Sequence, residues 1–235
     1  MGARYVVALD GPAGVGKSTV ARTLAQRLGA VYVSSGLVYR AAAWGTLHDG
    51  VSADDAEAVW AWLNKRRIEL RAIGNEAHVF LDGENLTERL HTLEVSERAS
   101  RLAALPEVRQ ALIERQREMA ERHPAVVMEG RDIGSAIFPD TPYKFYLEAD
   151  EAERARRRLE ELRAQGAALD HPKVQEAIRS RDALDSSRST APLRVPEGAH
   201  TVDTTDLGVP KVVEKILKHM ESMSFQAAQS SERPG

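Results

Sequence analysis

The chain has 235 residues, 43% of them hydrophobic, which is enough for one α/β domain with a substantial buried core. Its formal net charge of -3 argues against a protein built around a nucleic-acid backbone, and the absence of cysteine excludes disulfides, thiolate nucleophiles and cysteine-bound zinc. With no signal peptide and no apolar stretch of about 18 residues, we expect a soluble cytoplasmic protein that does not enter a membrane.

The first part of the chain predicts buried strands that alternate with helices, a pattern typical of a parallel sheet flanked by helices. Apolar runs indicate strands over residues 5–9 and 31–33, and helical periodicity covers 17–28, 37–48 and a third segment that runs through about Arg66. Gly29 ends the first helix, and Ser52-x-x-Asp55 resembles a capping box at the start of the third.

The pattern changes between Ile68 and Leu86, where apolar and polar residues alternate around two turn sequences. Gly74-Asn75 and Asp82-Gly83 are typical of hairpin turns. The sequence therefore predicts a small antiparallel insert in this segment.

The rest of the chain returns to the alternating pattern. Helical periodicity over 93–122 is interrupted at Pro106, and strands are predicted over 125–128, 143–147 and 201–202. Further helices are predicted to begin at Asp150 and at His171, and another covers 210–220. Residues 226–235, QAAQSSERPG, carry too little apolar surface to pack, so we expect a disordered tail there.

Residues 10–18 read DGPAGVGKS, directly after the first predicted strand. The spacing of Gly11, Gly16, Lys17 and Ser18 matches a phosphate-binding loop that opens a helix. Glycines let successive N–H groups point at the phosphates, the lysine adds a point charge, the serine offers a hydroxyl to Mg²⁺, and the helix dipole favours an anion. The stretch predicts a nucleoside triphosphate site and leaves the phosphate acceptor open.

Four segments can supply a second anion site. They carry Arg40 after the second strand, Glu129-Gly130-Arg131-Asp132 after the next, the arginines between 154 and 158, and Arg181 with Asp185 and Arg188. Arginine makes bidentate phosphate contacts and stabilises charge in phosphoryl transfer, so the set favours a site for two phosphorylated molecules. Each segment also has a plainer interpretation: a surface helix for Arg40, a strand end for 129–132, and a solvated helix face for 154–158.

The residues of the predicted site are more consistent with a phosphate group as the acceptor than with a hydroxyl group. A phosphate monoester has a second pKa of about 6 and is largely ionised at neutral pH, so it needs no general base. A hydroxyl acceptor would be expected to have a carboxylate or histidine beside it. Glu129 and Asp132 could still be such bases, while the histidines lack metal-ligand spacing.

The chain resembles the bacterial cytidylate kinases, which transfer the γ-phosphoryl group of ATP to CMP or dCMP. The resemblance runs from about Val6 to Met220. It rests on GPAGVGKST at 11–19, SGLVYR at 35–40, ASRLAALPEVRQALIERQR at 99–117, EGRDIGSAIFPD at 129–140 and RDALDSSRSTAPL at 181–193.

The resemblance implies one P-loop kinase domain over 1–225, a P-loop NTPase-type α/β fold with a parallel sheet of about five strands flanked by helices. Its core would be 1–36, 124–150 and 196–223; residues 37–123 would be the monophosphate-binding region with the β insert, and 151–172 a short helical lid. A monomer that acts on small molecules, with no nucleic-acid partner, is the corresponding expectation.

The resemblance also implies roles for individual residues. ATP would be bound by Gly11, Pro12, Ala13, Gly14, Val15, Gly16, Lys17, Ser18 and Thr19, with Mg²⁺ at Ser18 and, through water, at Glu129. The CMP phosphate would be surrounded by Ser35, Arg40, Arg131 and Arg188, with Tyr39 nearby, and the sugar held by Arg181 and Asp185. The catalytic set would be Lys17, Arg131, Arg154, Arg157, Arg158 and Arg188.

Ser100, Arg109 and Asp132 would then identify the base. Cytosine presents an amino donor beside two acceptors, which suits one carboxylate and two donors. A kinase for shikimate or dephospho-coenzyme A would lack this trio. A GTPase-like switch would need an Asn-Lys-x-Asp sequence, which the chain does not contain.

Two positions depart from the family pattern. Ser34 stands where the family usually has Asp, and Glu129 stands where it usually has the shorter Asp. The first removes a negative charge near the incoming phosphate, and the second leaves the geometry of the metal site open.

Overall fold

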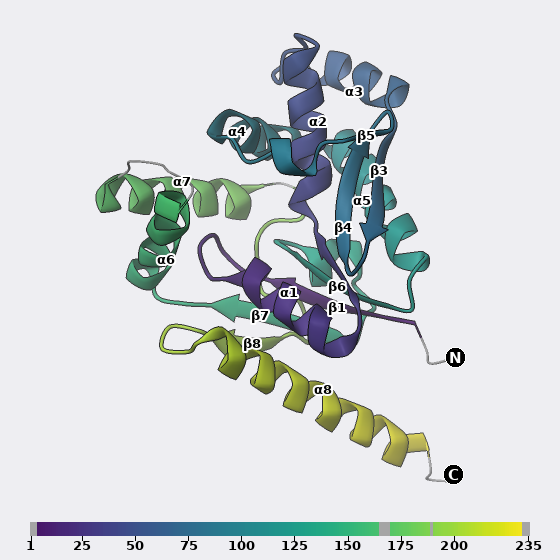
Figure 1. Ribbon diagram of the computed structural model, residues 1–235, viewed down its shortest axis with the longest axis vertical. Helices are drawn as coiled ribbons and strands as arrows, with labels where there is room; N and C mark the ends of the chain where they lie inside the picture. Colours follow the sequence, from purple (N-terminus) through teal and green to yellow (C-terminus); the bar gives the residue numbers. More distant parts are fainter. Residues whose placement is uncertain (1–3, 165–169, 189, 232–235) are drawn as a thin grey trace.

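The computed structural model describes residues 4–164, 170–188 and 190–231 (Figure 1). Its centre is a run of five strands that are all parallel. In spatial order they are β2 (Val31–Ser34), β6 (Ala125–Gly130), β1 (Tyr5–Asp10), β7 (Tyr143–Glu148) and β8 (His200–Asp203). This confirms the α/β class and the parallel arrangement that the alternating pattern predicts.

The register brings the carboxyl ends of the central strands to one edge. Asp10 of β1 lies opposite Gly130 of β6 and Tyr146 of β7, and Ser34 of β2 lies opposite Glu129. Polar residues that follow three different strands therefore meet at this edge, where ligands bind in open α/β sheets.

The predicted insert is antiparallel and extends the same sheet. It consists of β3 (Ile68–Ile73), β4 (Glu76–Leu81) and β5 (Glu84–Asn85), joined by the two predicted hairpin turns. β4 also pairs in parallel with β2 through Tyr32 and Glu76, so the insert joins the five parallel strands in one sheet of eight strands within the described residues. Local alternation predicts the hairpins, but it carries no information about this long-range pairing.

Helices bury both faces of the sheet, and alternate strand residues face opposite ways. Val7 and Val127 pack with α1 (Lys17–Leu28) and α8 (Val209–Ser231). Ala8 and Val126 belong to a larger core on the other face. The helices of that core are α2 (Gly36–His48), α3 (Ala56–Lys65), α4 (Leu93–Leu102) and α5 (Pro106–Glu121).

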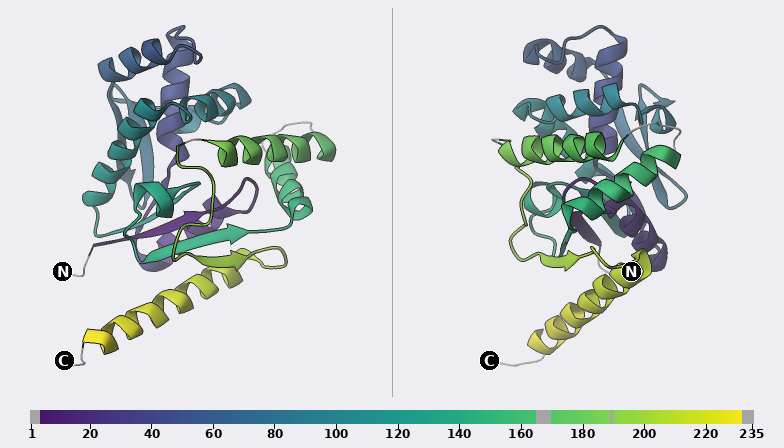
Figure 2. Two further views of the ribbon diagram at one scale, coloured as in Figure 1. Left: turned by 180° about the vertical axis from the view of Figure 1, so that it is seen from behind. Right: turned by 90° about the vertical axis from the view of Figure 1, so that its left-hand side faces the viewer.

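Two further helices form a layer of their own beyond the carboxyl ends of β1 and β7 (Figure 2). They are α6 (Glu151–Ala164) and α7 (His171–Ser187), which pack against each other. Their small apolar cluster contains Leu159, Val174 and Ile178, and it includes Ala13 of the phosphate loop. Residues 165–169 of the predicted lid lie outside the described residues.

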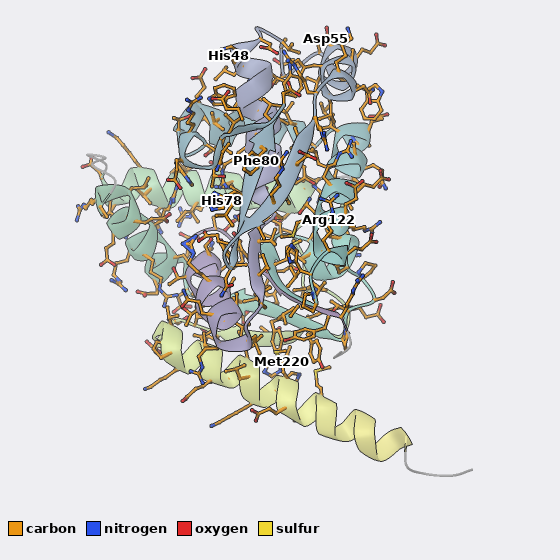
Figure 3. The ribbon with its side chains drawn as sticks, turned by 45° about the vertical axis from the view of Figure 1, so that its right-hand side comes forward. His48, Asp55, His78, Phe80, Arg122 and Met220 are labelled. Atoms are coloured by element: carbon orange, nitrogen blue, oxygen red, sulfur yellow. The ribbon has the colours of Figure 1, made fainter. Side chains whose placement is uncertain are left out.

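Local signals explain several helix ends. Asp55, labelled in Figure 3, begins α3 by accepting a hydrogen bond from Ala58 N at 2.9 Å. The expected cap at Ser52 is therefore wrong, because its hydroxyl instead accepts from Asp54 N within the preceding turn. Pro106 begins α5, which accounts for the break after α4.

Two short turns were not predicted, and the C-terminal helix is longer than predicted. A 3₁₀ turn, η1, covers Thr87–Arg89, and a π-helical turn, η2, covers Ile133–Ile137 directly after Asp132. α8 continues to Ser231, so residues 226–231 of the expected tail are helical, and 232–235 lie outside the described residues. No helix in the described ranges is both long and apolar enough to span a bilayer.

Gly45 on α2 should be intolerant of even one methyl group. A Cβ there would lie 2.4 Å from Cζ2 of Trp62, whose indole nitrogen is held by Asp49 at 2.7 Å. We expect Gly45→Ala to lower the free energy of unfolding by about 1–3 kcal/mol through overpacking, although alanine favours helices. Chemical denaturation measures this change.

Gly208→Ala is the matched control, because its Cβ would have only an ordinary contact, 3.8 Å from Pro210. Equal stability of Gly45→Ala and the unmodified chain would show that α2 and α3 separate at little cost.

Candidate functional site

A cavity of about 720 Å³ opens at the carboxyl ends of β1, β2 and β6. Its walls come from the loop between β1 and α1, the beginning of α2, the end of β6, helices α6 and α7, and the segment after β8. The predicted site residues among its walls are 13–19, Ser35, Arg40, Glu129, Arg131, Arg157, Arg158 and Arg181.

The backbone of the loop requires glycine at the predicted positions. Gly16 has φ 89° directly before the first residue of α1, and Gly14 has φ 75°. A Cβ at Gly14 would lie 2.6 Å from the carbonyl oxygen of Arg154, and one at Gly11 would lie 2.2 Å from that of Leu147. Glycine is therefore required here for left-handed backbone and for close approach to α6 and β7.

Lys17 is buried inside this loop. Its ammonium donates to the carbonyl of Pro12 at 2.7 Å, and burial together with the charge of Arg131 lowers its pKa to about 7. A bound phosphate would favour the ammonium form, so this lysine gains most of its charge stabilisation only when an anion is present.

Glu129 accepts hydrogen bonds from two serines. Ser18 of α1 donates to its Oε1 at 3.1 Å and Ser34 of β2 donates to the same atom at 2.7 Å. Burial alone would raise the pKa of Glu129, but Lys17 and the Ser34 hydrogen bond outweigh it and lower the pKa. The two positions that depart from the family pattern are therefore in direct contact.

Ser18 and Glu129 fit the Mg²⁺ site that the sequence predicts. An ionised carboxylate and a hydroxyl are hard oxygen ligands of the kind that Mg²⁺ takes, often through water. They belong to the wall of the same cavity as the loop. The longer glutamate still reaches the serine hydroxyl, so the departure at this position does not separate the two groups.

Three arginines, Arg40, Arg131 and Arg181, line the same cavity as the loop. Burial and the neighbouring Arg131 lower the pKa of Arg181 to about 10, and burial lowers the pKa of Arg40. Arg131 is held on both sides, because it donates to Gly11 O at 3.0 Å and to Asp185 Oδ2 at 2.8 Å. The charge of Arg131 lowers the pKa of both Arg181 and Arg40, and cations gathered in this way form a site for anions.

Not all predicted substrate residues border the cavity. Arg188 is ion-paired with Asp185, and the pair lies behind Arg131. Arg181, predicted at the sugar, borders the cavity that the phosphate loop opens into. The structure thus brings Ser35, Arg40, Arg131 and Arg181 together in the cavity wall. Arg188 does not border the cavity and contacts Asp185 instead.

The predicted base-reading residues are only partly assembled. Arg109 and Asp132 form a buried ion pair, with side chains 2% and 6% exposed, and the guanidinium lies 5.7 Å from the ring centroid of Tyr39. Within the described part of the chain, Arg109 Nε has no hydrogen-bond partner. Ser100 donates to Ser96 O of its own helix at 3.2 Å.

Two of the three predicted lid arginines hold the phosphate loop, and one of these, Arg157, also holds the segment after β8. Arg154 donates to Ala13 O at 3.0 Å and pairs with Asp182. Arg157 donates to Thr204 O at 2.6 Å and to Val15 O at 3.3 Å, while Arg158 pairs with Glu161 at 2.7 Å. Arg157 and Arg158 border the cavity.

Sequence reasoning missed three residues that shape the site. Asp10 is fully buried, accepts from Ile133 N at 2.7 Å and Gly134 N at 2.8 Å, and has its pKa raised by burial to about 7. Asp182 accepts from Ala13 N at 2.9 Å, and Thr204 receives the Arg157 contacts. Asp10 could have been identified from the sequence, because it is an acidic residue at the end of an apolar strand. No local sequence pattern identifies Asp182 or Thr204.

The sequence model of the cytidylate kinase family matches residues 7–222. A cytidylate kinase from Caldanaerobacter subterraneus subsp. tengcongensis is 45% identical over 212 residues, which are 90% of this chain and 92% of that protein. One from Pseudomonas aeruginosa is 41% identical over 226 residues, 95% of this chain and 98% of that protein.

The fold is also similar to the crystal structure of an uncharacterized protein from Eubacterium ventriosum, with a TM-score of 0.50. The match covers 93% of this chain and 99% of that chain at 15% sequence identity, which indicates a common fold alone. The match to the family model extends from β1 into α8, across all the strands and helices that form the cavity. The chain belongs to the cytidylate kinase family.

Proposed function

We propose that this protein transfers the γ-phosphoryl group of Mg²⁺-bound ATP to CMP or dCMP. The observation that carries the proposal is the presence of Arg40, Arg131 and Arg181 in the same cavity as the phosphate loop. A triphosphate site alone would not need three additional cations, whereas two phosphorylated substrates do. All these residues come from one chain, so the proposal requires no second copy.

The donor side would be bound by residues 11–19, with Lys17 beside the transferred group. The N–H groups at the beginning of α1 and the helix dipole favour the phosphates. When bound, Mg²⁺ would neutralise charge on the donor phosphates, and Ser18 and Glu129 are the residues that would hold it. Glu129 suits this role because its pKa is lowered and it is ionised at neutral pH.

The acceptor side would use arginines in place of a general base. The phosphate of CMP is already largely ionised at neutral pH, so the protein has to position it and stabilise charge. Arg40 and Arg131 would hold that phosphate, while Arg109 and Asp132 would exchange their mutual ion pair for contacts with cytosine. Closure of α6 and α7 would exclude water, which otherwise competes for the phosphoryl group.

The assignment of the acceptor predicts a narrow substrate range. With Mg²⁺ and ATP in excess, ADP release should be fast with CMP and dCMP and much slower with AMP, GMP and dTMP. A coupled assay with each monophosphate at the same concentration measures this preference. Preference for a purine nucleotide, or steady hydrolysis of ATP without an acceptor, would reject the proposal.

Replacement of Arg40 should weaken the use of CMP and leave the binding of ATP nearly unchanged. Arg40 borders the cavity and interacts with Glu129 through its charge, without an ion pair to it within the described part of the chain. We expect Arg40→Ala to lower kcat/KM for CMP about 10- to 100-fold, because one charge-assisted phosphate contact is worth about 1.5–3 kcal/mol. ATP binding should stay nearly unchanged in a titration.

Arg67→Ala is the matched control, since Arg67 is 75% exposed on the insert and pairs with Glu69. An unchanged KM for CMP in Arg40→Ala would mean that the acceptor phosphate binds elsewhere.

From the lowered pKa of Lys17, we predict that the protein takes up protons when it binds nucleotide. Burial and Arg131 lower the pKa of Lys17 to about 7, and a bound phosphate would raise that pKa again, so binding of MgADP at pH 7.5 should take up a fraction of a proton. The uptake should fall toward pH 6, because the amine of Lys17 is already protonated there before nucleotide binds. Calorimetry in buffers of different ionisation enthalpy measures it.

Lys17→Arg provides the control, because a guanidinium stays charged throughout this range. Proton uptake of the same size in that variant would assign it to another group.

A further inference from the structure

The phosphate loop and helix α7 are joined at Ala13, whose side chain and both backbone polar groups contact α6 or α7. Its methyl group belongs to the apolar cluster of Leu159, Val174 and Ile178, and the residue is 8% exposed. Its N–H donates to Asp182 Oδ1 at 2.9 Å, and its carbonyl accepts from Arg154 at 3.0 Å. The loop is therefore packed into the core of the helical pair.

Asp182 closes this connection from the α7 side. One carboxylate oxygen accepts from the loop, and the other is ion-paired with Arg154 of α6. The two side chains are only 17% and 12% exposed, so the pair is better shielded from water than most surface ion pairs. The carboxylate of Asp182 thus contacts both the loop and α6 from its position on α7.

The same helix carries residues of the acceptor side. Arg181, next to Asp182, borders the cavity, and Asp185, one turn later, accepts from Arg131 at 2.8 Å. A helix is a rigid element, so a displacement of the loop that moves Asp182 also moves Arg181 and Asp185. Donor and acceptor sites are therefore connected through consecutive turns of α7.

We propose that Asp182 is a positioning residue that couples donor binding at the phosphate loop to acceptor binding beside α7. This inference rests on the proposed function, because it takes CMP as the acceptor. ATP on the loop would fix Ala13, and through Asp182 it would fix α7 with Arg181 and Asp185 in the arrangement that binds CMP. By linkage, CMP must strengthen ATP binding by the same factor.

The test is calorimetric titration of CMP into the free protein and into protein saturated with Mg²⁺ and the non-hydrolysable analogue AMP-PNP. The ratio of the two dissociation constants is the coupling factor, and the reverse titration must give the same value. We expect a factor of about fivefold or more for the unmodified chain. Asp182→Ala should reduce it to near one while the affinity for each ligand alone changes much less.

Asp182→Asn separates the two contacts, because an amide oxygen can still accept from Ala13 N but cannot pair ionically with Arg154. It should retain part of the coupling. Glu176→Gln is the matched control, since it neutralises an exposed acid on the same helix and should leave the factor unchanged. Thermal unfolding of each variant establishes that it is folded.

A coupling factor near one in the unmodified chain, or a factor unchanged in folded Asp182→Ala and Asp182→Asn, would overturn the inference. Loss of affinity for CMP by the same amount with and without AMP-PNP would also overturn it, because that result describes a purely structural role. Failure of the unmodified chain to bind CMP at all would instead reject the proposed acceptor, and the same titrations with the monophosphate that the kinase assay selects would then decide the coupling.

Discussion

Lys17, Arg131 and Arg181 lie close enough in one cavity that the charge of Arg131 lowers the pKa of both Lys17 and Arg181, and the protein must offset this repulsion before any phosphate is bound. It does so with carboxylates from other elements. Glu129 at the end of β6 faces Lys17, and Asp185 on α7 holds Arg131. The sheet edge and α7 must therefore meet, and a phosphate that enters meets cations already held in place.

This requirement explains why the site is built from so many segments. Arg131 follows β6 and meets Asp185 of α7, and Arg154 of α6 meets Asp182 of α7, so charge is balanced between segments. The parallel sheet brings the ends of β1, β2 and β6 to one edge, and α7 supplies the remaining residues. Asp10 holds the turn after Asp132 through two backbone N–H groups, which fixes the direction of that segment.

Local sequence predicts the parts of this site that depend on local geometry. The phosphate loop is identified by its own spacing, and the two hairpin turns by Gly74 and Gly83, which have positive φ. Asp182 and Ala13 are 169 residues apart, and no local pattern connects them. The same limit applies to the pairing of β4 with β2 and to the ion pair between Arg109 and Asp132, which depend on tertiary packing.

The hydrogen bond between Ser34 and Glu129 has a consequence for how this sequence can change. A carboxylate in place of the Ser34 hydroxyl would face Glu129 at close range, and two carboxylates that close share a proton instead of both ionising. The neutral Ser34 hydroxyl donates to Glu129 and helps to lower the pKa of that carboxyl group, without a second negative charge beside it. The charge of the metal-facing group at the end of β6 therefore depends on a residue of the neighbouring strand β2.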